Sequence, residues 1–124
     1  MVFQCTAALV TLATANIDEL VLFYTKLLGQ EPKLYIPNVY AEFQLPTLRI
    51  GIFKPKETNQ TEFENSVKSG MSLCLEVSDL AEAIAHLKAL GYPPPGKIIT
   101  ASHGIETYTY DPDGNRLILH QSVS

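Results

Sequence analysis

Apolar residues recur at helical spacing through positions 17–28, directly after a segment whose residues favour a β-strand. Positions 5–15 alternate weakly and are rich in Val, Thr, Leu and Ala, which is typical of a strand. Asn16 suits the N-cap, with an acidic residue three positions later, and Gly29 suits the C-terminal stop. The pattern therefore predicts a strand followed by a capped helix.

The same pattern returns in the second half, after an interval of about half of the 124 residues. A strand-like segment at 73–77 leads to the N-cap Asp79, an apolar stripe over 80–90 and the terminating Gly91. A period of this length indicates one supersecondary unit that occurs twice, with its copies packed together. The duplication also identifies equivalent positions in the two halves.

Three further strand-like segments follow each predicted helix. They cover 33–36, 40–45 and 48–53 in the first half, and 97–101, 105–110 and 116–121 in the second. Each half therefore predicts a βαβββ unit. Together the halves predict an α+β fold in which two tandem units form a curved mixed sheet around a cavity.

Length and composition fit one folded domain. With 46% hydrophobic and 18% charged residues, the chain can bury a core and is not expected to be disordered. We expect a single domain of two repeats, about 1–58 and 68–124, joined by a polar linker with a short helical turn near 63–67.

Charge and cysteine content indicate which partners and which cellular compartment to expect. The net charge of -4 and the scattered basic residues argue against binding nucleic acid. We expect no signal peptide and no membrane span, because no suitable apolar stretch is present. Cys5 and Cys74 form no disulfide or Cys-x-x-Cys pattern. These features together predict a cytoplasmic protein with reduced thiols.

Three motifs carry a resemblance to a known superfamily. They are Asn16-Ile17-Asp18-Glu19-Leu20 with Phe23-Tyr24 and Leu28-Gly29, then Leu75-Glu76-Val77-Ser78-Asp79-Leu80, and finally Asp111-Pro112-Asp113-Gly114-Asn115-Arg116. In this order and spacing the chain resembles the vicinal oxygen chelate superfamily. That superfamily includes glyoxalase I, extradiol dioxygenases, fosfomycin-resistance transferases and bleomycin-resistance proteins. The resemblance spans essentially the whole chain, and it implies the predicted fold and a homodimer.

The resemblance also implies four positions for the ligands of a divalent metal, which catalytic members hold through His, Gln or Glu. These positions fall on Leu9, Gly51, Ser72 and Ile118, with Gly51 supplied by aligning the two repeats. Leu, Gly and Ile offer no ligand atom, and one Ser hydroxyl is a poor neutral ligand. We therefore expect no metal and no other cofactor, with a divalent metal as the less favoured alternative.

Strand alternation predicts which side chains line the cavity, if Leu9 and Ser72 point inward. The lining is apolar at its centre and polar towards its ends, which suits a small organic molecule. It consists of Leu9, Thr11, Arg49, Gly51, Phe53, Ser72, Cys74, Glu76, Thr107, Thr109, Arg116, Ile118 and His120.

The register of the last two strands is predicted from the turn at 111–115. With Asp111 opposite Arg116, two threonines lie on the cavity face and two tyrosines on the core face of this hairpin. These residues are Thr107, Thr109, Tyr108 and Tyr110.

Glu76 and His120 are the candidates for acid–base chemistry, provided that they lie within hydrogen-bond reach. The favoured alternative is that Glu76 pairs with a Lys or Arg at the sheet end and that His120 is partly exposed. His86 is expected to face solvent, and His103 to be a turn residue that either rims the cavity or has no function. An apolar strand disfavours Cys74 as a thiolate nucleophile.

Three functions are consistent with the sequence. The favoured one is a metal-free protein that binds a small organic molecule in a cavity at a homodimer interface, as the resemblance to bleomycin-resistance proteins implies. The acidic balance favours a cationic compound. The second is a lyase- or dioxygenase-type enzyme with a displaced site around Glu76, His103, Glu106 and His120. The third is a module that docks to a protein partner.

Overall fold

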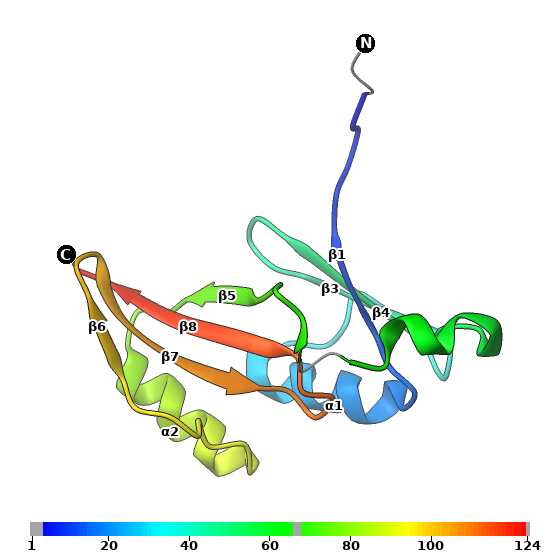
Figure 1. Cartoon of the computed structure of the whole chain (residues 1–124). Coiled ribbons are helices and arrows are strands. Elements are labelled where there is room, and N and C mark those ends of the chain that lie inside the picture. The colour runs from blue at the N-terminus through cyan, green and yellow to red at the C-terminus, as the bar shows by residue number, and fades with distance from the viewer. Residues whose placement is uncertain (1–3, 66–67, 124) are drawn as a thin grey trace. The chain divides into compact units, whose positions relative to one another are not determined.

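Each repeat folds into its own four-stranded sheet, in which the first and last strands of the repeat lie side by side and parallel (Figure 1). The computed structural model describes residues 4–65 and 68–123. The chain divides into two units, Met1–Phe63 and Glu64–Ser124. The prediction of an α+β fold with two βαβββ repeats is confirmed, and neither sheet is closed.

The first unit has the sheet order β1-β4-β3-β2, with α1 covering one face. Its elements are β1 (Val10–Ala13), α1 (Ile17–Leu28), β2 (Leu34–Ile36), β3 (Tyr40–Gln44), β4 (Arg49–Phe53) and the 3-10 helix η1 (Glu57–Phe63). Asn16 caps α1 by accepting a hydrogen bond from the Glu19 amide at 3.3 Å. Gly29 ends the helix in the left-handed conformation, with φ of 66°.

Apolar side chains of α1 pack against alternate residues of the sheet, which places the core of this unit. The helix contributes Ile17, Leu20, Val21, Phe23 and Tyr24, and the sheet contributes Ala41, Phe43, Ile50 and Ile52, all of them buried. The ring centroids of Tyr24 and Phe43 lie 6.4 Å apart, which fills the space between helix and sheet.

The second unit repeats this arrangement in the order β5-β8-β7-β6. Its elements are β5 (Leu73–Glu76), α2 (Leu80–Leu90), β6 (Ile99–Ala101), β7 (Gly104–Tyr110) and β8 (Arg116–Ser122). Asp79 caps α2 by accepting from the Glu82 amide at 3.1 Å, and Gly91 ends it with φ of 90°. The core between α2 and the sheet consists of Leu73, Leu80, Leu87, Leu117 and Leu119.

The predicted register of the β7–β8 hairpin is wrong by one residue. The structure pairs Tyr110, and not Asp111, with Arg116, so the connecting loop has one residue more than predicted. The Asp111 side chain remains in the loop, where its carboxylate accepts from the amides of Asp113 and Asn115, both at 2.9 Å. A shift of one residue exchanges the two faces of a strand.

One further local prediction differs from the structure, and another cannot be compared with it in full. The strand predicted at 5–15 is confined to Val10–Ala13, because only these residues pair with β4. The helical turn predicted near 63–67 lies partly outside the described residues, and the 3-10 helix ends at Phe63. Neither α1 nor α2 has the length and apolarity that a membrane-spanning helix requires.

The packing of α1 predicts unequal effects of two leucine substitutions on the same helix. Leu20 is fully buried, whereas Leu22 is 54% exposed. Leu20→Ala should lower the free energy of unfolding by about 2–5 kcal/mol, because it leaves a cavity in the core. Leu22→Ala is the matched control and should change it by less than about 0.5 kcal/mol. Urea unfolding followed by circular dichroism measures both, and equal losses would contradict this packing.

Candidate functional site

The face of the second sheet that α2 leaves uncovered carries the polar side chains of β5, β7 and β8. Because Leu117 and Leu119 point towards α2, Arg116, Ile118 and His120 lie on the uncovered face. The observed register places two residues of β7 beside them on that face. Glu106 is paired with His120, and Tyr108 is paired with Ile118.

His120 and Glu76 come together on this face, as acid–base chemistry would require. His120 Nδ1 and Glu76 Oε1 are in direct hydrogen-bond contact, because the parallel pairing of β5 with β8 sets the two residues side by side. His120 is only 6% exposed. The second oxygen of Glu76 accepts from the Ser122 hydroxyl at 3.0 Å. The favoured alternative, with Glu76 paired to a Lys or Arg and His120 partly exposed, is therefore wrong.

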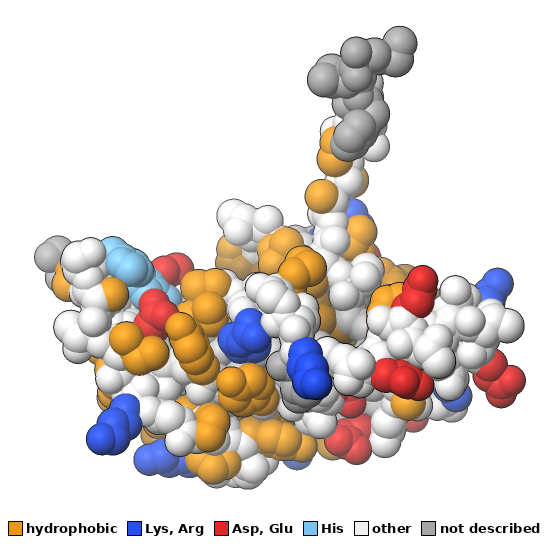
Figure 2. All heavy atoms as spheres, viewed as in Figure 1, with side chains coloured by type: hydrophobic (Ala, Val, Ile, Leu, Met, Phe, Trp, Pro, Cys, Tyr) orange, Lys and Arg blue, Asp and Glu red, His pale blue; other side chains and the backbone are white. Residues whose placement is uncertain are grey.

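Two further side chains gather around His120. The His103 ring, which precedes β7, stacks on the His120 ring with centroids 4.9 Å apart. Glu106 lies 3.9 Å from His103, measured from Oε1 to Nε2. Figure 2 shows histidine and acidic side chains together where β7 begins and β8 ends. The prediction that His103 is a turn residue is confirmed, and the structure adds that its ring contacts His120.

Two predicted lining residues lie on the other face of the second sheet. Thr107 and Thr109 pair with Leu119 and Leu117, and both threonines are 1% exposed on the side of α2. Of the two tyrosines predicted for the core face, Tyr108 is instead 39% exposed. The sequence placed Glu106 in the alternative displaced site, but the predicted lining included neither Glu106 nor Tyr108, because the predicted loop was one residue too short.

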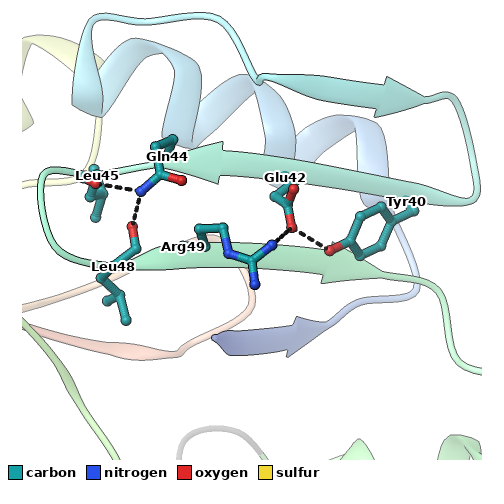
Figure 3. Close-up of polar contacts among 6 residues, drawn as sticks. All are labelled: Tyr40, Glu42, Gln44, Leu45, Leu48 and Arg49. Carbon is teal, nitrogen blue, oxygen red and sulfur yellow. Dashed lines mark hydrogen bonds and ion pairs between the residues drawn. The ribbon is translucent and has the colours of Figure 1, made fainter. Parts of the chain in front are cut away.

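The uncovered face of the first sheet carries a polar network centred on Glu42 (Figure 3). Its carboxylate accepts from the Tyr40 hydroxyl at 3.2 Å and from the Arg49 guanidinium at 3.3 Å. Burial raises the pKa of the Tyr40 hydroxyl, and the hydrogen bond to Glu42 raises it further. At the other end of the same hairpin, the Gln44 amide donates to the carbonyls of Leu45 and Leu48.

Gly51 stands at one of the four expected metal-ligand positions, and the space beside it is filled. A Cβ at this position would lie 2.7 Å from the Tyr40 hydroxyl and 3.3 Å from the Leu9 side chain. Leu9 is itself another of the four positions, and it offers only carbon atoms there. The first unit therefore has no donor atom at its two positions, and a tyrosine occupies the room that a ligand side chain would need.

The second unit's pair of positions is also unsuited to a cation. Arg116 donates to the Ser72 hydroxyl at 2.9 Å and to the Ser69 carbonyl at 2.8 Å. A guanidinium so close to the Ser72 oxygen disfavours a second positive charge at that oxygen. The neighbouring position is Ile118, which has no donor atom. The residues present therefore do not fit a metal at the expected positions.

A shallow hollow of about 400 Å³ lies in the first unit, between the end of β4 and η1. Phe53 and Phe63 line it, and their rings meet edge to face with centroids 5.5 Å apart. Lys54 and Lys56 stand at the same hollow. Phe53 is the predicted lining residue found there. The hollow thus combines two aromatic rings with charged groups of both signs, since Glu62 lines it as well.

Cys74 lies on the uncovered face of the second sheet, beside Ile118. Desolvation raises the pKa of its thiol above the ordinary value of 9.0, and the negative charges of Glu76 and Glu106 raise it further. A thiol with a raised pKa is a weak nucleophile at neutral pH. The structure agrees with the interpretation of Cys74 as an inert side chain.

A protein-family comparison matches residues 6–119 to the Glyoxalase/Bleomycin resistance protein/Dioxygenase superfamily. A search of curated proteins finds no match.

Solved structures of that kind share the fold. A glyoxalase/bleomycin resistance protein from Catenulispora acidiphila is 20% identical, with a TM-score of 0.69 over 94% of this chain and 97% of the other. A bleomycin-binding protein solved with bleomycin is 23% identical, with a TM-score of 0.66 over 96% and 100% of the two chains. A fosfomycin resistance protein from Listeria monocytogenes is 17% identical, with a TM-score of 0.75 over 98% and 96%.

The raised pKa of Cys74 predicts slow alkylation of this residue in the folded protein. Iodoacetamide reacts with the thiolate, so the pH midpoint of Cys74 alkylation should lie higher in native protein than in protein unfolded by urea. Alkylation is carried out in the presence of EDTA. Peptide mass spectrometry then distinguishes alkylated Cys74 from alkylated Cys5. Identical midpoints in the two states would contradict the environment described for this thiol.

Proposed function

The chain belongs to the Glyoxalase/Bleomycin resistance protein/Dioxygenase superfamily, and on this premise we propose that it binds a small organic molecule without a metal at the superfamily's usual positions. The observation that carries the proposal is that the residues at those positions are unsuited to act as metal ligands. Leu9 and Ile118 are apolar, Gly51 is crowded by Tyr40, and Ser72 is held by Arg116. A metal-dependent reaction would need ligands where these residues stand.

The uncovered faces of the two sheets support binding of an organic molecule. Each combines apolar groups with a few fixed polar ones, which is the usual character of small-molecule sites. On the first sheet these include Phe53, Leu9 and the Arg49–Glu42 pair. On the second they include Ile118, Tyr108 and Arg116. A similar protein has been solved with bleomycin, which makes bleomycin a reasonable first probe.

A second candidate is an enzyme with a displaced site, and the contact between Glu76 and His120 favours it. A carboxylate on Nδ1 orients an imidazole and leaves Nε2 available to accept a proton. Glu106 and His103 stand close enough to contact a substrate at this nitrogen. We rank this function second because the pair lies away from the positions at which members of the superfamily hold their metal.

We also propose a homodimer in the cytoplasm, in keeping with the resemblance to dimeric members of the superfamily. Sedimentation equilibrium of the full chain should then give about twice the mass of 13.7 kDa. A species of monomer mass at all accessible concentrations would contradict the dimer.

Ligand binding in the presence of EDTA tests the proposed function. Bleomycin, fosfomycin and a library of small cationic and neutral compounds serve as probes in a thermal-shift assay. A true ligand at 100 times its dissociation constant should stabilise the protein by about 2.7 kcal/mol. The stabilisation should be equal with and without EDTA.

Two variants locate the bound ligand on the second sheet. Ile118→Ala should weaken binding, because Ile118 lies on the uncovered face, while Ile98→Ala should not, because Ile98 is exposed outside the strands. A ligand that binds only after metal is added would refute metal-independent binding. Equal binding by both variants would exclude the second sheet as the site.

A further inference from the structure

We propose that His103, Glu106 and His120 bind a divalent transition-metal ion, with Glu76 positioning His120. The inference goes beyond metal-independent binding of an organic ligand, because this site lies apart from the four positions of the superfamily. One ligand atom from each of the three residues can be chosen so that all lie within 4.8 Å of one another.

His120 is the best-prepared ligand of the three. Its Nδ1 is taken by Glu76, so the neutral ring carries its proton on Nδ1 and presents a lone pair at Nε2. Nε2 is buried and has no hydrogen-bond partner within the part of the chain that the structure describes. Buried polar atoms normally have a hydrogen-bond or metal partner. The lone pair of His120 Nε2 therefore indicates a partner that the described residues themselves do not provide. A metal ion supplies that partner.

Glu106 and His103 complete the ligand set from two sides. The Glu106 side chain is 18% exposed and is placed beside His120 by strand pairing. The His103 side chain is 66% exposed, which leaves it room to turn its nitrogen towards an ion. Tetrahedral ligands at about 2.0–2.2 Å from zinc lie roughly 3.3 Å apart. The three ligand atoms, which lie within 4.8 Å of one another, therefore have to come closer together, and the exposed His103 side chain can make that movement.

Gly104 avoids a steric clash with His120 Nε2. A Cβ at this position would lie 2.9 Å from His120 Nε2 and 2.2 Å from the Gln121 carbonyl oxygen. Its φ of 153° is also one that side-chain-bearing residues rarely adopt. A residue with a side chain would therefore crowd the nitrogen that faces the proposed ion.

The donor set indicates which metals fit. Two imidazoles and one carboxylate suit zinc, iron, cobalt or nickel, and three protein ligands leave a coordination position open. Magnesium and calcium prefer sets made wholly of oxygen atoms. At such sites a carboxylate commonly accepts a hydrogen bond from the other nitrogen of a ligating histidine and so orients its ring. Glu76 has this role for His120.

Zinc titration of the full chain tests the proposal. Untagged protein is stripped with EDTA, the EDTA is removed, and Zn²⁺ alone is titrated by isothermal calorimetry and by competition with a chromophoric chelator. We expect one zinc per chain and no binding of Mg²⁺. His103→Ala and Glu106→Gln should each weaken zinc binding at least tenfold, because each removes a ligand. Glu76→Gln should weaken it by about 10- to 100-fold.

The matched control is His86→Ala, because His86 is an exposed histidine on α2, away from the cluster. This variant should bind zinc as the wild type does, and circular dichroism checks that every variant is folded. Absence of zinc binding, or equal binding by wild type, His103→Ala and Glu106→Gln, would overturn the proposal. Equal weakening by His86→Ala would do so as well. Because the organic-ligand assay runs in EDTA, its failure leaves this titration unaffected.

Discussion

The turn that joins β7 to β8 fixes the chemistry of the second unit. The Asp111 carboxylate accepts from two backbone amides and from the Asn115 side chain, the last at 2.8 Å, and so holds the loop in one conformation. The loop sets the register of the hairpin, and the register decides that Glu106 and not Thr107 stands beside His120. Parallel pairing of β5 with β8 then brings Glu76 to the same histidine. The cluster around His120 is thus a consequence of two strand pairings.

Other side chains contact two of the four expected metal positions, Gly51 and Ser72. Tyr40 projects into the space beside Gly51, where its hydroxyl bonds to Glu42. Arg116 uses the Ser72 hydroxyl to hold the residues before β5. These contacts give the polar side chains of Tyr40, Ser72 and Arg116 partners within the protein. They also explain why any metal would have to bind elsewhere.

Most of the fold was predictable because it depends on local signals. Asn16 and Asp79 accept from the amides expected of them, and both glycines end their helices with positive φ. The apolar spacing of α1 and α2 identified the covered faces of the sheets. These features follow from helix periodicity and capping, which a single sequence displays directly.

The site was less predictable because it depends on contacts between distant residues. Glu76 and His120 are 44 positions apart, and the sequence could state only the condition under which they meet. A single residue in the Asp111 loop reversed the assignment of the threonines and tyrosines. The stacking of His103 on His120 has no signal in the sequence, since a histidine before a glycine is an ordinary turn residue.

The most direct test of this account is anomalous X-ray diffraction from crystals of the protein soaked in zinc, recorded at the zinc absorption edge. We expect a peak next to His120 Nε2, within coordination distance of Glu106 and His103. We expect no peak at Leu9, Gly51, Ser72 or Ile118. A peak at those four positions, or none at His120, would contradict it.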